Sequence, residues 1–157
     1  MKLKKTVLCA LCALCAVFCL ISCGKESAKT VDLAALREQM KTQAGIADAT
    51  DLAADRLESL YGIAPEDVKE AACFLSMGAA FPDEVLMIEA TDAAAAARIA
   101  EKLNVHMEEL RVQAQNYDAQ SYALFEKCKV GTAGTYVTLF CSPKAEQLQS
   151  IFDAAAK

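Results

Sequence analysis

Eight cysteines and a single histidine are the residues of this chain with the most distinctive chemistry. Four of the cysteines have the spacing C-x2-C-x2-C-x3-C, which is typical of iron–sulfur cluster ligands. They are Cys9, Cys12, Cys15 and Cys19. The residues between them are apolar, however, and Leu20 follows where such a motif continues with proline. Because cysteine also behaves as a small hydrophobic residue, the sequence favours an apolar segment over a cluster site.

The apolar run that holds these cysteines predicts an export signal. It extends from Val7 to Ile21 and follows three lysines within the first five residues. A positive start, an apolar core of about 7–15 residues and a small residue before the cut are typical of a secretory signal. A membrane-spanning helix needs about 20 apolar residues, so the run is short for a permanent anchor. We therefore predict that residues 1–22 form a signal peptide that is removed.

The end of this run, Leu20-Ile21-Ser22-Cys23, resembles the lipobox of bacterial lipoproteins. The resemblance implies cleavage between Ser22 and Cys23 and a thioether-linked diacylglycerol on Cys23. Two acyl chains suffice for stable anchoring, since each buried methylene contributes about 0.8 kcal/mol. We expect residues 23–30 to be a flexible tether. Residues 31–157 would then form one domain, held at the outer face of the cytoplasmic membrane through acylated Cys23.

The predicted mature chain is acidic. Removing residues 1–22 from the 157-residue chain leaves 135, enough for one domain with its own core. The loss of three lysines changes the net charge from −5 to −8. A chain this acidic, without a basic cluster, is a poor candidate for binding nucleic acid. We expect its partners to be the membrane, through the lipid, and possible proteins of the cell envelope.

Few residues of the mature chain have the types needed for catalysis or metal binding. Cys73, Cys128 and Cys141 permit at most one disulfide, and the sequence does not say which two would pair; buried free thiols are favoured. His106 borders the apolar stripe of a predicted helix, and no nucleophile motif accompanies it. Zinc would need three or four ligands from histidine and cysteine at closer spacing. We predict no catalytic residues, no metal and no cofactor.

The acidic residues resemble functional motifs only superficially. A calcium loop would require the pattern D-x-[DN]-x-[DN]-G-x5-E, which is absent. Helix caps and solvated surface positions explain these carboxylates more simply. The residues concerned are Asp48, Asp51, Asp55, Asp83, Glu84, Glu108 and Glu109.

Periodicity predicts an α+β fold in the order α-α-β-β-α-α-β-β-α. We expect a small, mainly antiparallel sheet of about four strands in two hairpins, with helices packed on one face. Pro82 interrupts the first hairpin, and residues 131–134 form the turn of the second. The expected helices are 31–44, 51–61, 93–115, 119–127 and 144–155, and the expected strands are 68–77, 85–88, 127–130 and 135–141.

Several short motifs resemble those of a known family. They are Tyr61-Gly62-Ile63 with Asp67, the strand before Pro82, the long helix leading to Tyr117, and residues 134–137. The chain is in these respects similar to small uncharacterised bacterial lipoproteins, found chiefly in Gram-positive gut anaerobes and catalogued as a domain of unknown function. The resemblance extends from Val31 to the C-terminus. It implies lipid-anchored export and supplies no catalytic residues.

Three functions fit the sequence. The first is a non-catalytic binding or interaction module. The second is a small cell-envelope hydrolase, for which His106 should lie within about 3.2 Å of a thiol. The third is a solute-binding accessory of a transporter, for which 135 residues are few if two lobes must enclose a cleft.

Overall fold

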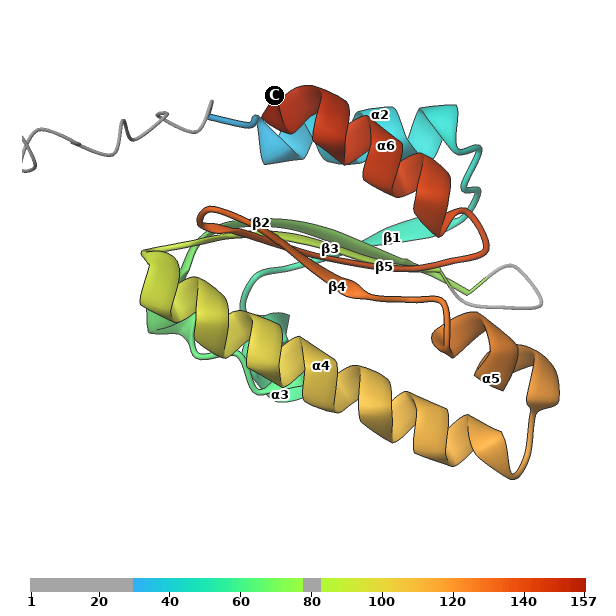
Figure 1. Ribbon diagram of the computed structural model, residues 1–157. Coiled ribbons are helices and arrows are strands. Elements are labelled where there is room, and N and C mark those ends of the chain that lie inside the picture. The colour runs from blue at the N-terminus through green and yellow to red at the C-terminus, as the bar shows by residue number, and fades with distance from the viewer. Residues whose placement is uncertain (1–29, 78–82) are drawn as a thin grey trace, which may run out of the picture.

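The protein is an α+β domain in which one sheet lies between two layers of helices (Figure 1). The computed structural model describes residues 30–77 and 83–157. The predicted signal peptide, Cys23 and Pro82 lie outside these residues. The helices are α2 (Leu33–Gln43), α3 (Arg56–Tyr61), α4 (Ala93–Gln115), α5 (Ala119–Phe125) and α6 (Ala145–Ala156), with a 3-10 turn η2 at Pro65–Asp67. The strands are β1 (Ala49–Leu52), β2 (Val68–Ser76), β3 (Asp83–Ala90), β4 (Val130–Ala133) and β5 (Tyr136–Cys141).

The sheet has five strands in the order β1-β2-β3-β5-β4, and all neighbouring strands are antiparallel. The antiparallel arrangement and both hairpins were predicted. This strand order places β3 and β5 side by side at the centre of the sheet, so the two hairpins are joined through these two strands. The prediction of about four strands missed β1, the short edge strand that pairs with β2.

Helices cover both faces of the sheet, so the prediction of helices on one face is wrong. Helices α2 and α6 pack on one face, and α3, α4 and α5 lie on the other (Figure 1). The reason is visible in β3, where Val85 and Met87 face α2 and α6 while Leu86 and Ile88 face α4. All four side chains are fully buried. A strand that is apolar on both faces needs a covering layer on each.

The segment expected to begin the second helix is partly a strand. Asp51 was predicted to cap this helix, but it lies in β1, and α3 starts at Arg56. Its carboxylate forms ion pairs with Arg37, at 3.1 Å, and with Lys41, both of which come from α2. The strand therefore gains its stability from pairing with β2 and from side chains of a distant helix, neither of which local sequence reveals.

Most helix ends follow from local sequence. The expected end of the second helix at residue 61 is confirmed, because Gly62 adopts a left-handed φ of 64° directly after α3. The expected starts of the helices at residues 93 and 119 are confirmed as well, because Asp92 and Asp118 cap α4 and α5 by accepting hydrogen bonds from backbone N–H groups. The second hairpin turns later than expected, at Gly134 and Thr135, because Gly134 is the residue with positive φ (62°).

Candidate functional site

The sheet presents a row of side chains to the α4 layer at one end. Strand register places Leu75 of β2 beside Glu84 of β3, and Glu84 beside Cys141 of β5. His106 and Leu110 of α4 lie over this row, together with Phe125 of α5. These residues, with Met77, line a pocket of about 210 Å³. Its wall is mostly apolar, and its polar groups come chiefly from Glu84 and His106.

Glu84 is the centre of a hydrogen-bonded cluster with Tyr61 and His106. The Tyr61 hydroxyl donates to Glu84 Oε1 at 2.6 Å. His106 Nε2 lies 3.1 Å from both carboxylate oxygens. The phenol and imidazole rings meet edge to face, with 4.9 Å between their centroids. Three elements, α3, β3 and α4, each supply one member, so the cluster ties the two helices to the centre of the sheet.

The cluster shifts the pKa values of Tyr61 and His106. The hydrogen bond with Glu84, supported by the charges of Glu84 and Glu109, raises the pKa of His106 against the opposing effect of burial. Burial raises the pKa of Tyr61, and the negative charge of Glu84 raises it further. The phenol therefore stays protonated at neutral pH and acts as a donor to Glu84. The imidazole is held close to the carboxylate as its partner.

None of the described cysteines is hydrogen-bonded to His106. The predicted burial of Cys73, Cys128 and Cys141 is confirmed. Burial raises the pKa of Cys73 to about 12, and its thiol contacts the carbonyl oxygen of Met87 at 3.9 Å. A hydrogen bond with Cys128, followed by burial, raises the pKa of Cys141. Cys141, which among the described cysteines is the one that lines the histidine's pocket, is thus held as a neutral thiol.

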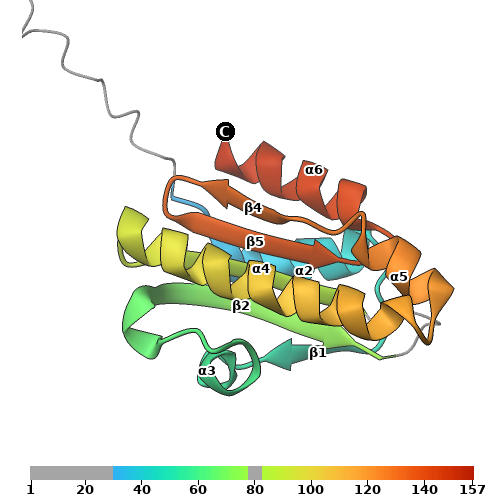
Figure 2. The same cartoon turned by 60° about the horizontal axis from the view of Figure 1, so that its bottom comes forward.

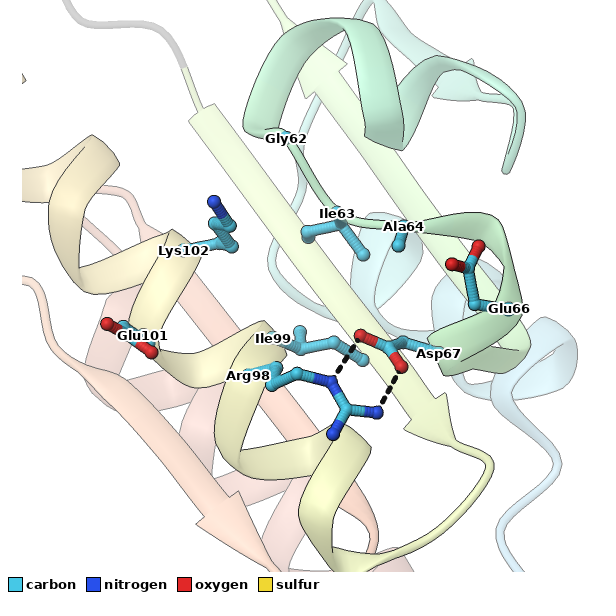
Figure 3. A pocket seen from close by; sticks show the side chains of 9 residues that line it. All are labelled: Gly62, Ile63, Ala64, Glu66, Asp67, Arg98, Ile99, Glu101 and Lys102. Carbon is cyan, nitrogen blue, oxygen red and sulfur yellow. Dashed lines mark hydrogen bonds and ion pairs between the residues drawn. The ribbon is translucent and has the colours of Figure 1, made fainter.

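A second pocket, of about 540 Å³, lies between the α3–η2 connection and the first half of α4. Figure 3 shows Arg98 reaching across it to Asp67, with Lys102 near Gly62. Arg98 Nε lies 2.9 Å from Asp67 Oδ2, and Nη2 lies 2.5 Å from Oδ1. Asp67 is buried, and the hydrogen bond from Arg98 lowers the pKa of its carboxyl group.

The Asp67–Arg98 pair already has a structural role. The Asp67 carbonyl accepts the N–H of Thr91 at 3.0 Å, so this residue joins the start of β2 to the start of α4. Because Arg98 uses two of its five N–H donors on Asp67, the other three are left to face solvent or a ligand. The pocket's other charged side chains, Glu66, Glu101 and Lys102, include both signs. Together with Asp67 and Arg98 they make three acidic and two basic side chains, a formal charge of −1 that does not strongly favour one class of ion.

The acidic residues noted in the sequence differ in their exposure and in their hydrogen-bond partners. Asp48, Asp55, Glu108 and Glu109 are exposed. The expectation that Asp83 and Glu84 are solvated is wrong: Asp83 is buried and accepts a hydrogen bond from the Ser142 hydroxyl at 2.5 Å, and Glu84 is the centre of the cluster. The alternation of β3 could have indicated this, since Glu84 shares a face with buried Leu86 and Ile88. Within residues 30–77 and 83–157, no group of three or more His, Cys, Asp or Glu could hold a metal ion.

Comparison with known proteins gives one match. The family DUF4358, described as a domain of unknown function, matches residues 42–142, which is more than half of the chain. This region contains the whole sheet and every residue of the Glu84 pocket. No curated protein and no solved structure matches. In the part of the chain that the structure describes, none of the helices has the length and apolar character needed to cross a membrane.

Proposed function

The chain belongs to the DUF4358 family, a domain of unknown function, and we propose that it is a lipid-anchored binding module at the outer face of the cytoplasmic membrane. The observation that carries the anchor is the sequence Leu20-Ile21-Ser22-Cys23 at the end of a short apolar run. Acylation of Cys23 supplies two chains, which is the number required for stable attachment. The module then presents the Glu84 pocket to small molecules outside the cell.

The proposed tether limits how far the domain can move from the membrane. The N–H of Val31 donates to the Tyr136 hydroxyl at 3.0 Å, and Val31 is buried, so this residue is already held within the folded domain. Only residues 23–30 then separate the lipid from the domain. At about 3.3–3.6 Å per extended residue, eight residues reach at most about 29 Å. The domain is accordingly kept within roughly one bilayer thickness of the surface.

The Glu84 pocket supports binding rather than catalysis. Glu84 orients His106 as the third member of a catalytic triad orients a base. The described residues give that base no hydrogen-bonded nucleophile, and the pKa of Cys141, the thiol that lines the same pocket, is raised. A hydrolase of the kind the sequence allowed needs a thiolate or an activated hydroxyl within reach of the imidazole. The cluster instead offers a fixed carboxylate at the edge of an apolar wall.

The dimensions of the pocket define the class of ligand. A volume of about 210 Å³ is below the range of about 300–1,000 Å³ that holds drug-sized ligands. A carboxylate has about four acceptor positions, and Tyr61 and His106 occupy only some of them. We therefore assign to the pocket a small molecule with an apolar body and one cationic or hydrogen-bond-donating end, which Glu84 would accept.

The anchor is tested by the intact mass of the full chain expressed in a bacterium that processes lipoproteins. We expect the wild type to lack residues 1–22 and to carry a diacylglyceryl group on Cys23. Cys23→Ala should retain the signal segment and carry no lipid, while Cys19→Ala, altered within the apolar run, should be processed like the wild type. A wild-type product that begins at Met1 without acyl chains contradicts the anchor.

Binding is tested with n-butylamine, n-butanol and butyrate, which share one apolar body and differ in the polar end. Because His106 is the sole histidine, its imidazole gives a single set of NMR signals in the full chain. We expect the amine to shift these signals at the lowest concentration and butyrate at the highest. Glu84→Gln should remove the preference for the amine, and Glu108→Gln, at an exposed position, should retain it. Equal responses to all three compounds would refute the assignment.

A further inference from the structure

Two of the three described cysteines, Cys128 and Cys141, lie close together beside the segment that connects α5 to the second hairpin. In this hairpin Val130 pairs with Leu139. Cys128 lies two residues before this strand pair and Cys141 two residues after Leu139, so the same alignment extended beyond the ladder brings them level, and their thiols hydrogen-bond to each other. Directly opposed residues of antiparallel strands have Cα atoms about 4.5–5.5 Å apart. This separation lies within the range of about 4.4–6.8 Å that a disulfide bridges.

The backbone around Cys128 is held in place from two sides. Arg111 of α4 donates to the Cys128 carbonyl at 3.1 Å and to the Phe125 carbonyl at 3.2 Å. The N–H of Cys128 bonds to the Leu124 and Phe125 carbonyls, both at 3.3 Å. The Cys128 thiol itself contacts the Leu124 carbonyl at 3.3 Å. The opposition of the two cysteines is therefore set by α4 and α5 as well as by the hairpin.

Cys73 is too far from either residue to form a bridge. It pairs with Leu86 of β3, which in turn pairs with Leu139 of β5. Two steps between strands separate Cys73 from β5, or about 9–10 Å. Cysteines whose Cα atoms are more than about 7 Å apart cannot be joined without moving the backbone. The structure thus answers the question that the sequence left open, namely which two of the three cysteines could pair.

We propose that Cys128 and Cys141 form a reversible disulfide by exchange with the disulfide of a small thiol. The Cys128 thiolate attacks one sulfur of the oxidant, whose S–S bond breaks and whose leaving thiolate takes up the proton released by Cys128. The Cys141 thiolate then attacks the Cys128 sulfur of the mixed disulfide and expels the second small thiolate, which takes up the proton of Cys141. Two protein thiols lose two electrons, and the oxidant gains them as two thiols.

The surroundings assign the first attack to Cys128. The thiol of Cys141, the N–H of Ser142 and the charge of Arg111 together lower the pKa of Cys128 despite burial, whereas that of Cys141 is raised. Leu124 and Ser142, whose backbone atoms contact the Cys128 sulfur, also line an open pocket of about 680 Å³. Cys128 is itself buried and does not line this pocket, so a small disulfide reaches its sulfur from this side only when Leu124 and Ser142 move apart. Cys141 is then positioned to resolve the mixed disulfide.

Oxidation would couple the redox state to the Glu84 pocket. Cys141 lines that pocket beside Glu84, and Cys128 follows α5, which supplies Phe125 to the same wall. A bond between the two sulfurs fixes α5 to β5 and withdraws the Cys141 thiol from the pocket. The inference does not depend on the anchor, because the bridge lies entirely within the folded domain.

The test is a titration of the full-length chain with mixtures of oxidised and reduced glutathione. The protein is quenched with acid, its free thiols are alkylated, and the peptides are mapped by mass spectrometry. We expect a peptide pair joined through Cys128 and Cys141 and lighter by two hydrogen atoms, with Cys73 remaining a free thiol. Closing a loop of this length should raise the apparent melting temperature by about 10 °C.

Variants distinguish an internal bridge from general reactivity. Cys73→Ala should form the same cross-linked peptide, while Cys128→Ser and Cys141→Ser should leave the remaining cysteine reduced or bound to glutathione. The wild-type map decides the question even if one variant does not fold. Separate glutathione adducts on Cys128 and Cys141, or no joined peptide at excess oxidant, would overturn the proposal. Because the peptides are identified directly, the result is independent of whether Cys23 is acylated.

Discussion

The two faces of the sheet differ in what they bury. The α2/α6 face, by which we mean the side covered by α2 and α6, is filled mainly by apolar contacts among Leu33, Met40, Phe74, Met87, Phe140, Leu148 and Phe152. The α4 face, covered by α3, α4 and α5, also has an apolar core, including Leu57, Ile63, Leu86, Ile99 and Leu103. It holds in addition all three described cysteines, the sole histidine and Tyr61.

We therefore expect the α2/α6 face to contribute mainly to stability and the α4 face to hold the side chains that recognise a ligand. Figure 2 shows α4 lying across the sheet, and both the Asp67–Arg98 pocket and the Glu84 pocket lie along it. Arg98 and His106 are eight residues apart on α4, or about 12 Å at 1.5 Å per residue. A continuous helix thus fixes the distance between the two polar clusters. The α2/α6 face supplies the rigid support on which that arrangement depends.

The largest expected effect comes from truncating a core side chain on the α2/α6 face. Phe74→Ala removes a fully buried ring between β2 and α2 and should lower the free energy of unfolding by about 3–5 kcal/mol, measured by urea denaturation. Leu103→Ala, the counterpart on the α4 face, should cost about 2–5 kcal/mol.

The comparison of faces adds a second readout to these variants. Under conditions in which Phe74→Ala is still folded, its His106 signals should respond to butylamine as in the wild type. Leu103→Ala should weaken this response, because Leu103 lies one turn before His106 on α4. If Phe74→Ala abolished the response in the folded state, the two faces could not be treated as separate in function.

The next effect comes from the polar cluster. Tyr61→Phe leaves Glu84 without one charged hydrogen bond and should lower the free energy of unfolding by about 1.5–3 kcal/mol. In the Glu84→Gln background the acceptor is neutral, so adding Tyr61→Phe should lower the free energy of unfolding by a smaller amount. A double-mutant cycle measured by urea denaturation would give this coupling. Additive losses would mean that the hydroxyl and the carboxylate do not interact energetically.

Part of the stability of the α4 face should depend on pH. Since folding raises the pKa of His106, its contribution is fully present below the unfolded value of about 6.5 and is lost as the pH rises through the folded pKa. Unfolding experiments between about pH 6 and pH 8 should show a decline in stability that His106→Gln removes. Glu84→Gln should flatten the same decline and bring the NMR-measured pKa of the imidazole back towards its ordinary value. An unchanged imidazole pKa in Glu84→Gln would contradict the assigned cause.

The sequence predicts those features of the fold that depend on neighbouring residues, and it misses those that depend on residues far apart in the chain. The local signals held: Gly62 ends α3, and Asp92 and Asp118 cap their helices. Alternation in β3 indicates that Glu84 points inward, but its partners come from a helix that starts nine residues later and from a side chain 23 residues earlier, so no local pattern reveals them. His106 was correctly placed at the border of an apolar stripe, but its partner was not.

The two-sided sheet was the main feature of the fold that the sequence-based prediction of helices on one face got wrong. Both sets of alternating side chains in β5 are largely apolar, yet neither they nor the continuous apolar run in β3 say which helices cover which face. That assignment depends on non-local packing, in which α2 and α6 contact one set of side chains and α4 contacts the other. Cys128 and Cys141 become neighbours through the same non-local geometry.

The smallest effect tests the corrected role of Asp51. As an exposed partner of Arg37 and Lys41 it should contribute about 0.2–1 kcal/mol, and Asp51→Ala should lose this amount in low salt. In about 1 M salt the screening length falls to about 3 Å, so the effect should nearly vanish. Asp92→Ala is the matched control, because removing a true helix cap costs about 1 kcal/mol through a short hydrogen bond. Urea denaturation at both salt concentrations should show a persistent loss for Asp92→Ala alone. A salt-independent loss for Asp51→Ala would mean that Asp51 acts as a cap after all, and that β1 is less important to this edge of the sheet than its pairing with β2 indicates.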